Sequence, residues 1–397
     1  MARSVHTRCA SCCVSNSPDP AVVRPRAPSV RVFRRAGGGR HPTVSPVPAT
    51  PQRILLIRPS ALGDVCRSAP ALASLRAAFP NARIDWLVRD VFADAVRAHP
   101  ALTGVVEFPR DRLRRWWTPG GIGPARAWLR SLREPRYDAV VDLQGLARSG
   151  LFALATRAPV RVGPAGAAEF ASLAYTRRVR TNPRTHVVER ALEIVRALGA
   201  EPVRDVRLYA PADAPHPAPD LARARTSVLA PTSAWPGKRW PAERFAALAR
   251  RLLDTGAVER VAVVGAAGER GSIGPVLDLC RDDPRAVDLV GRTTVGGLMR
   301  AIESAALVVA HDSAAAHLAV GFGRPLVALL GPTDARLAGP FDRLDAVVQR
   351  VSENDRLTDR ACKDESLGAG LMRRITVDDA FAKALEQLSR EPAGASP

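Results

Sequence analysis

Short, continuous runs of apolar residues recur along most of the chain. Ile54–Ile57 is such a run, and a strand that is buried on both faces of a parallel sheet has this pattern. Between the runs, apolar residues recur at the spacing of a helix. Strands that alternate with helices predict βαβ units with right-handed crossovers. The first series has predicted strands at 54–57, 84–88, 105–108 and 139–143, and predicted helices at 65–78, 91–98, 122–133 and 187–198.

The alternation stops between Tyr209 and Asp220, where four prolines replace large apolar residues. This composition is typical of a moderately stiff interdomain linker. A second alternating series follows, so the pattern predicts an α/β protein with two Rossmann-like domains facing a central cleft. The carboxyl ends of the strands are where such a cleft holds a nucleotide-linked ligand. The second series has predicted strands at 227–230, 261–265, 287–290, 307–310 and 326–330, and predicted helices at 241–253, 295–304, 313–321 and 376–389.

The first 52 residues differ in composition from the rest of the chain. They carry eight prolines, eight arginines and one aspartate, with neither a strand nor a helix period, which predicts a disordered basic tail. The expected segments are this tail at 1–52, an N-terminal Rossmann-like domain at 53–208, a Pro-rich linker at 209–226, a C-terminal Rossmann-like domain at 227–375, and a last helix and tail at 376–397.

The charge of the chain indicates anionic partners. Its net charge is +19, and all but three of its 58 basic residues are arginine. Such a balance suits phosphates, nucleic acid or a membrane surface, although a GC-rich codon usage also favours arginine. No apolar run is long enough for a transmembrane helix. The six cysteines form no disulfide framework, which favours a reducing compartment.

Several common nucleotide motifs are missing from the sequence. No Gly-x-Gly-x-x-Gly follows a predicted strand and no P-loop occurs, which argues against dinucleotide redox chemistry and P-loop hydrolysis. No Asp-x-Asp occurs either, so we expect neither a metal nor a cofactor. A bound diphosphate then has to be neutralised by Lys, Arg and helix N-termini.

Three loops at strand ends carry candidate chemistry, and the first is Ser60–Asp64. Asp64 can be a helix N-cap, for which Asp is among the best residues. It can also be a carboxylate that a βα loop presents to the cleft, where it takes a proton from an acceptor hydroxyl. Its position leaves both interpretations open.

The second loop is Pro231–Pro241, directly after the first strand of the second series. A Trp-Pro entry to a helix can serve packing alone. Lys238, however, is one of three lysines in a chain that otherwise uses arginine, and a compact ammonium suits a phosphate oxygen. We therefore favour a binding role, and expect Lys238→Ala to lower turnover and donor affinity while melting stays almost unchanged.

The third loop is His311–His317, again between a strand and a helix. In a structural interpretation, Asp312 or Ser313 caps the helix and His317 is solvated or satisfied in the core. In a functional one, a diphosphate binds the free amides of Ser313 and Ala314, with His317 on the same face. The presence of the other two loops favours the functional interpretation.

In combination, these motifs resemble glycosyltransferase family 9, the ADP-heptose:lipopolysaccharide heptosyltransferases. The resemblance covers roughly 53–390, and the stretches Arg110–Trp117 and Phe170–Glu189 are most similar to the heptosyltransferase I branch. The residues that carry it are Arg53–Asp64, Tyr137–Gly145, Lys238–Pro241, Gly265–Glu269, Asp312–His317 and Gly331–Asp334.

The resemblance implies a GT-B fold and an inverting, metal-independent transfer of heptose from ADP-heptose to the Kdo/inner core of lipopolysaccharide. The acceptor would bind the N-terminal domain and the nucleotide sugar the C-terminal domain. One departure is Ala314, where the family often has Gly, because the added methyl narrows the approach of phosphate if that residue needs a positive φ. The implied roles are general base for Asp64, diphosphate binding for Lys238, ribose contact for Glu269, and donor binding for Ser233, Asp312, Ser313, Ala314 and His317.

The acceptor is assigned to residues of the N-terminal domain. The basic stretch before Trp116 and Trp117 is either a solvated helix end or an acceptor lip whose guanidinium groups bind Kdo carboxylates or lipid A phosphates. The tryptophans would then settle at the membrane interface. We expect a monomer at the anionic cytoplasmic face of the inner membrane, acting on a Kdo–lipid A acceptor. The candidate acceptor residues are Ser60, Gly63, Gln144, Arg112, Arg114 and Arg115.

Two other classes of function share some features of this sequence. A nucleotide-diphosphate enzyme of different chemistry, such as an epimerase, shares the two-lobed fold, but it needs a glycine-rich redox site that the sequence lacks. A nucleic-acid-binding protein would explain the charge. The arginines are spread along the chain with few interleaved aromatics, however, so no nucleic-acid partner is expected.

Overall fold

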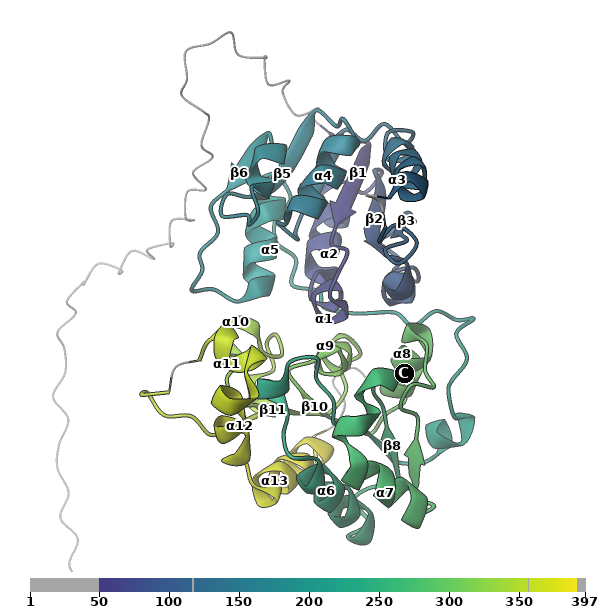
Figure 1. Cartoon of the computed structure of the whole chain (residues 1–397), viewed down its shortest axis with the longest axis vertical. Helices are drawn as coiled ribbons and strands as arrows, with labels where there is room; N and C mark the ends of the chain where they lie inside the picture. Colours follow the sequence, from purple (N-terminus) through teal and green to yellow (C-terminus); the bar gives the residue numbers. More distant parts are fainter. Residues whose placement is uncertain (1–49, 116–117, 356, 391–397) are drawn as a thin grey trace, which may run out of the picture.

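The computed structural model describes residues 50–390 except 116–117 and 356, and it contains two six-stranded sheets (Figure 1). All strand pairs are parallel. The first sheet has the order β3-β2-β1-β4-β5-β6, and the second has the order β12-β11-β10-β7-β8-β9. Counted from β7, the second order repeats the first, so the predicted α/β fold with two Rossmann-like halves is confirmed. The predicted tail at 1–52 lies outside the described residues, except for its last three.

The first half contains β1 to β6 and the helices between them. Its bounds are β1 Arg53–Ile57, α1 Leu62–Cys66, α2 Ala69–Ala78, β2 Arg83–Arg89, the 3₁₀ helix η1 Asp90–Ala95, β3 Gly104–Phe108, α3 Pro119–Ser131, β4 Ala139–Asp142, α4 Ala147–Ala155, β5 Val160–Pro164, the 3₁₀ helix η2 Ala171–Ala174, β6 Arg177–Val179 and α5 Val187–Arg196.

The second half follows a segment that is mostly without regular structure, broken by the 3₁₀ helix η3 Pro219–Arg223. Its bounds are β7 Thr226–Ala230, the 3₁₀ helix η4 Pro236–Lys238, α6 Ala242–Asp254, β8 Arg260–Val263, the 3₁₀ helix η5 Ala267–Ser272, α7 Gly274–Asp282, β9 Ala286–Asp288, α8 Val295–Glu303, β10 Leu307–His311, α9 Ala314–Gly321, β11 Leu326–Leu330, α10 Ala335–Ala338, the 3₁₀ helix η6 Leu344–Ala346, β12 Val347–Gln349, α11 Asp359–Lys363, α12 Glu365–Arg373 and α13 Val377–Leu388.

Three local predictions differ from the structure. The helix predicted at 65–78 is two helices, α1 and α2, because Pro70 lies in the first turn of α2, where its missing N–H costs no hydrogen bond. The helix predicted at 91–98 is the 3₁₀ helix η1. Several short elements were not predicted, because their apolar residues form neither a continuous run nor a long period: helices α4, α7, α10, α11 and α12 and strands β5, β6 and β12.

The central strands are the most buried parts of the protein. Ile54, Leu55, Leu56 and Ile57 are fully buried, since β1 lies between β2 and β4 and helices cover both faces of the sheet. Strand β10 has the same position in the second sheet, between β7 and β11. Burial on both faces explains why these strands are apolar at every position rather than at alternate ones.

The two halves meet along α1 and α9, which face each other in Figure 1. Small residues allow this approach: a Cβ added to Gly63 would lie 3.0 Å from Cδ2 of His317 and 3.5 Å from Cα of Ala314. Beside this packing contact, hydrogen bonds also join the halves. Nη1 of Arg67 donates to the Ala338 carbonyl (2.9 Å), and Nε2 of His186 donates to the Gly339 carbonyl (3.0 Å).

Within the described residues, no helix is long and apolar enough to cross a membrane.

Candidate active site

A cavity of about 590 Å³ lies between the two halves. Its walls are the loops that follow β1, β7, β8, β9 and β10, together with η1 and the starts of α1, α8 and α9. Strand order reverses between β1 and β4 and between β7 and β10, so the loops after these strands diverge and leave room for a ligand. The predicted site residues that line this cavity are Gly63, Asp64, Ser233, Lys238, Glu269, Asp312, Ser313, Ala314 and His317.

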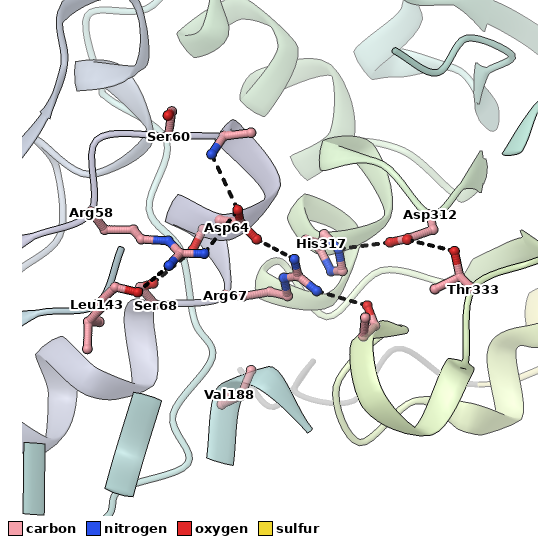
Figure 2. A network of polar contacts seen from close by, with 12 residues as sticks. Arg58, Ser60, Asp64, Arg67, Ser68, Leu143, Val188, Asp312, His317 and Thr333 are labelled. Atoms are coloured by element: carbon pink, nitrogen blue, oxygen red, sulfur yellow. Dashed lines mark hydrogen bonds and ion pairs between the residues drawn. The ribbon is translucent and has the colours of Figure 1, made fainter. Parts of the chain in front are cut away.

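Asp64 is held by two guanidinium groups on the first wall of the cavity (Figure 2). It is the third residue of α1, whose N-cap is Ala61, so the prediction that Asp64 is the N-cap is wrong. Its carboxylate accepts a hydrogen bond from the Ala61 backbone N–H (3.4 Å) and pairs with Nη2 of Arg58 (2.9 Å) and with Arg67. The side chain thus closes the first turn of α1 and also faces the cavity.

These charges keep Asp64 ionised. Burial by itself would raise the pKa of Asp64, but the nearby Arg58 and Arg67 outweigh burial and hold the pKa below its ordinary value. The position of Asp64 in the first turn of α1 favours the same ionised form. Such a group is a weak base in the resting state, and it accepts a proton only from a hydroxyl that is becoming acidic.

Lys238 and Asp312 form a buried ion pair on the opposite wall. Nζ of Lys238 lies 2.5 Å from Oδ2 of Asp312, and the two side chains are only 13% and 9% exposed. The ammonium also lies 4.5 Å from the ring centroid of Trp235, and the hydroxyl of Thr333 donates to Asp312 (3.1 Å). Lys238 follows β7 and Asp312 follows β10, which are neighbours in the sheet, so the fold brings together two loops that are distant in sequence.

Burial by itself would raise the pKa of Asp312, but the hydrogen bond from His317 and the charge of Lys238 outweigh it and lower the pKa well below its ordinary range. Nε2 of His317 lies 3.5 Å from Oδ1 of Asp312. Burial lowers the pKa of His317, as does the nearby Arg67. His317 is therefore not solvated: it is buried and bonded to Asp312, as the structural interpretation allows, but it also lines the cavity, near Arg67 of the other half (Figure 2).

The first turn of α9 presents small residues to the cavity. Ser313 is its N-cap, but its side chain makes no capping hydrogen bond, and within the described residues its buried Oγ has no partner. Ala314 begins the helix and is not among the residues with positive φ, so its methyl group strains no backbone. A helix start with free amides and small side chains is suited to an anion.

Two further predicted donor residues line the same cavity. Ser233 is buried, and its Oγ accepts a hydrogen bond from the Trp235 N–H (3.3 Å). Glu269 lies in η5 and accepts a hydrogen bond from the Ala266 N–H (2.9 Å). Oε1 of Glu269 has no hydrogen bond within the described residues, so this carboxylate can still accept one from a ligand hydroxyl.

The predicted acceptor residues are not all brought together. Gln144 accepts a hydrogen bond from the Ser60 N–H (3.4 Å), which places this pair beside the α1 loop but outside the cavity lining. The basic residues Arg112, Arg114 and Arg115 are exposed in the segment after β3, and Arg114 lines a different cavity. Trp116 and Trp117 lie outside the described residues.

The partners of the predicted residues are not identified by the sequence motifs. Arg58 directly follows β1, and Arg67 lies three residues after Asp64, which is the spacing of side chains on one helix face. That spacing is a signal that could have identified Arg67. Thr333 lies in the motif Gly331–Asp334 after β11, but nothing local pairs it with Asp312. No local signal points to Phe92 of η1, which lines the cavity.

Two Rossmann-like halves with a cavity between the carboxyl ends of their sheets form the GT-B architecture. The sequence model of glycosyltransferase family 9 (heptosyltransferase) matches residues 125–366. The chain belongs to this family, and it is a glycosyltransferase.

Relatives of known name agree with this membership. Lipopolysaccharide heptosyltransferase 1 of Pseudomonas aeruginosa (strain PAO1) is 31% identical over 304 residues, which cover 73% of this chain and 82% of the relative. The protein of the same name from Escherichia coli (strain K12) is 28% identical over 312 residues, covering 76% of this chain and 95% of the relative.

Solved structures show the same fold. The E. coli ADP-heptose lps heptosyltransferase II has a TM-score of 0.67 at 21% identity, with 85% of this chain and 98% of that chain covered. The E. coli heptosyltransferase WaaC with ADP has a TM-score of 0.62 at 27% identity, with 72% and 90% covered. The GT-B fold expected from the sequence is confirmed.

Proposed function

We propose that this protein is an inverting, metal-independent heptosyltransferase that moves heptose from ADP-heptose to the Kdo/inner core of lipopolysaccharide. The observation that carries the proposal is the cavity itself. Asp64 lies on one wall, and Lys238, Asp312, His317 and the start of α9 lie on the other. The relatives named lipopolysaccharide heptosyltransferase 1, and the related structures with ADP and with ADP-2-deoxy-2-fluoro heptose, support this donor and this acceptor.

The reaction follows from the charges on the two walls. The acceptor hydroxyl oxygen attacks the anomeric carbon from the face opposite the diphosphate, and the bond from that carbon to the diphosphate oxygen breaks with its electron pair. The proton of the hydroxyl passes to Asp64. Lys238 and the amides at the start of α9 stabilise the negative charge that develops on the leaving ADP. Attack from the opposite face inverts the anomeric configuration.

These protein groups take the role that a divalent cation has in other nucleotide-sugar enzymes. We therefore assign donor binding to the C-terminal domain at 227–375, with Ser233, Glu269, Asp312, Ser313, Ala314 and His317 around the nucleotide sugar. Acceptor binding is assigned to the domain at 53–208. The linker at 209–226 joins the two domains, and the last helix and tail at 376–397 follow the second one. Ser60, Gly63 and Gln144 lie nearest Asp64, whereas Arg112, Arg114 and Arg115 would meet the more distant phosphates of the acceptor.

The acceptor is lipid-borne, so we propose that the enzyme acts as a monomer bound peripherally to the anionic cytoplasmic face of the inner membrane. The net charge of +19 supports attraction to such a surface. No nucleic acid has a role in this function.

The test is thermal stabilisation by ADP, UDP and GDP with EDTA present, followed by transfer from ADP-heptose to a Kdo–lipid A acceptor. We expect ADP to raise the melting temperature most and transfer to proceed in EDTA. Equal shifts for the three nucleotides would contradict the donor assignment. A strict requirement for Mg²⁺ would contradict the metal-independent mechanism. The anomeric configuration of the transferred heptose, determined by NMR and compared with that of the donor, tests the inversion.

A further inference from the structure

A second cavity, of about 500 Å³, lies on the outer side of the first half, between the end of β3 and the helices α3 and α4. Among the described residues it shares no lining residue with the cavity that holds Asp64. Its lining is of two kinds only. Eight of the described lining residues are apolar, four are arginine, and none is acidic.

The apolar floor follows from the helix period. On α3, Ile122, Ala125 and Leu129 recur at the spacing of one helix face, and this face is turned toward Phe152 of α4. The rings of Phe108, Trp128 and Phe152 pack against one another with centroids 4.9–5.2 Å apart, so the floor is rigid. The floor is thus suited to a flexible apolar ligand.

The four arginines form a rim around this floor. They are Arg110, Arg114, Arg126 and Arg148, and none of them has a carboxylate partner within the part of the chain that the structure describes. Arginine is otherwise the usual cation in the ion pairs of this protein. The neighbouring Arg89, for example, is paired with Asp111 (2.7 Å). Four like charges around one cavity repel each other, and an anion above the floor would relieve that repulsion.

The apolar surface continues outward from the cavity. Leu151 and Leu154, on the outer face of α4, are 49% and 46% exposed. Beyond them, Phe170 and Leu173, at and within η2, are 83% and 63% exposed, and η2 packs against α4 close to Gly150. Exposed apolar residues grouped beside clustered arginines are typical of a surface that rests on a membrane interface.

Charge decides among the possible occupants. The N-terminal segment 1–52 has eight arginines and one aspartate, so it is repelled by the rim. A second copy docked through the same face would place arginines against arginines. Nucleic acid supplies phosphates for the rim but no flexible apolar chain for the floor. An anionic lipid supplies both groups in one molecule.

We infer that this Arg-rimmed cavity binds one anionic phospholipid of the bilayer, with an acyl chain on the apolar floor and the phosphate among the four guanidinium groups. Arginine binds phosphate in a bidentate geometry, which suits this rim. Leu151, Leu154, Phe170 and Leu173 then enter the interface around the bound lipid. The inference rests on the proposed function for the membrane-borne acceptor, and it gives Arg114 to the phospholipid in place of the acceptor phosphates. It is independent of sugar transfer.

The test measures binding of the full-length protein to phosphatidylglycerol/phosphatidylcholine vesicles, with neither donor nor acceptor present. Arg126→Ala/Arg148→Ala should lower the partition coefficient roughly 25-fold, since each arginine near an anionic surface contributes a factor of about five. Leu151→Asp should lower it roughly tenfold, because the half-exposed leucine no longer enters the interface. Arg250→Glu and Leu385→Asp, exposed on the other half, are the matched controls and should bind like the native protein.

A second probe separates the cavity from a flat charged surface. Lysophosphatidylglycerol below its micelle concentration should bind saturably, whereas sn-glycerol 3-phosphate, which has no chain, should not compete at equal concentration. Ala125→Phe fills the floor and keeps all four arginines, so it should abolish saturable binding of the lysolipid. Every variant carries the same N-terminal segment, so its contribution cancels.

Native-like lysolipid binding by Ala125→Phe would overturn the inference, because the chain would then lie elsewhere. If Ala125→Phe does not fold, native-like vesicle binding by Leu151→Asp, whose side chain is exposed in the fold, would overturn it instead. Concentration-dependent dimerisation, or stronger binding to single-stranded DNA than to vesicles, would assign the face to a different partner. If the native protein binds vesicles but transfers no heptose, the proposed function is contradicted and the lipid site is not.

Discussion

The buried pair of Lys238 and Asp312 makes a sharp prediction about Lys238→Ala. The sequence alone predicts a binding role for Lys238 and almost unchanged melting. In the structure Lys238 lies 2.5 Å from Asp312, with both side chains nearly buried. Removal of one partner leaves an uncompensated carboxylate in a poorly solvated place.

The loss can be sized from the contacts that remain. Removal of one partner of a buried ion pair costs about 3–5 kcal/mol. Asp312 keeps the hydrogen bond from Thr333 (3.1 Å) and the contact with His317 (3.5 Å). We therefore expect the free energy of unfolding of Lys238→Ala to fall by about 3 kcal/mol, at the lower end of that range. Lys238→Ala/Asp312→Asn, which buries an amide instead of a charge, should recover about 2 kcal/mol of this.

The assay is a double-mutant cycle in urea unfolding, combined with calorimetric titration of ADP. Lys363→Ala is the matched control, since Nζ of Lys363 lies 5.2 Å from the same Trp235 ring but has no carboxylate partner among the described residues. Native-like stability of Lys238→Ala would refute the reasoning, as would a double variant no more stable than the single one. Native-like ADP binding by a stable double variant would show that the role of Lys238 is structural only.

Three further predictions concern single side chains. Arg67→Leu removes a charge that lowers the pKa of Asp64, so the acid limb of the pH profile of kcat/KM should move to higher pH; an unmoved limb would show that Asp64 does not titrate in the reaction. Gly63→Val should destabilise the protein by about 1–3 kcal/mol, since a Cβ there already lies 3.0 Å from His317, whereas Gly120→Val, with no atom near its Cβ, tests whether bulk alone is responsible in urea unfolding. His311 is buried, its Nε2 accepts the Trp240 N–H (2.8 Å), and burial lowers its pKa to about 4. Below about pH 6.5 the unfolded chain takes up a proton at His311 that the folded protein refuses, so this residue alone should lower stability by about 3 kcal/mol by pH 4. His311→Asn should remove this share of the acid destabilisation and leave that of the other buried histidines, such as His186; an unchanged slope would contradict it.

Local patterns were sufficient for the strands at the centre of each sheet. Ile54–Ile57 and Leu326–Leu330 are apolar at every position because helices cover both faces of their sheets, and such runs are readable without a structure. The short strands β5 and β6 and the helix α4 lack that signal. The break between α1 and α2 also has a local signal, because Pro70 favours the first turn of a new helix over the interior of a long one.

The sequence by itself also indicated which loops line the cavity, since in a parallel sheet ligand-binding loops follow strands and each of these loops has a local motif. Only the tertiary structure decided which groups meet. Lys238 and Asp312 are 74 residues apart in the chain, and they pair because β7 and β10 are neighbours where strand order reverses. Asp64 meets His317 and Arg67 meets Ala338 only because α1 and α9 pack together across the two halves. Residue periods record whether a position is buried, but strand order and the packing of the halves select its partner, and no local pattern contains that information.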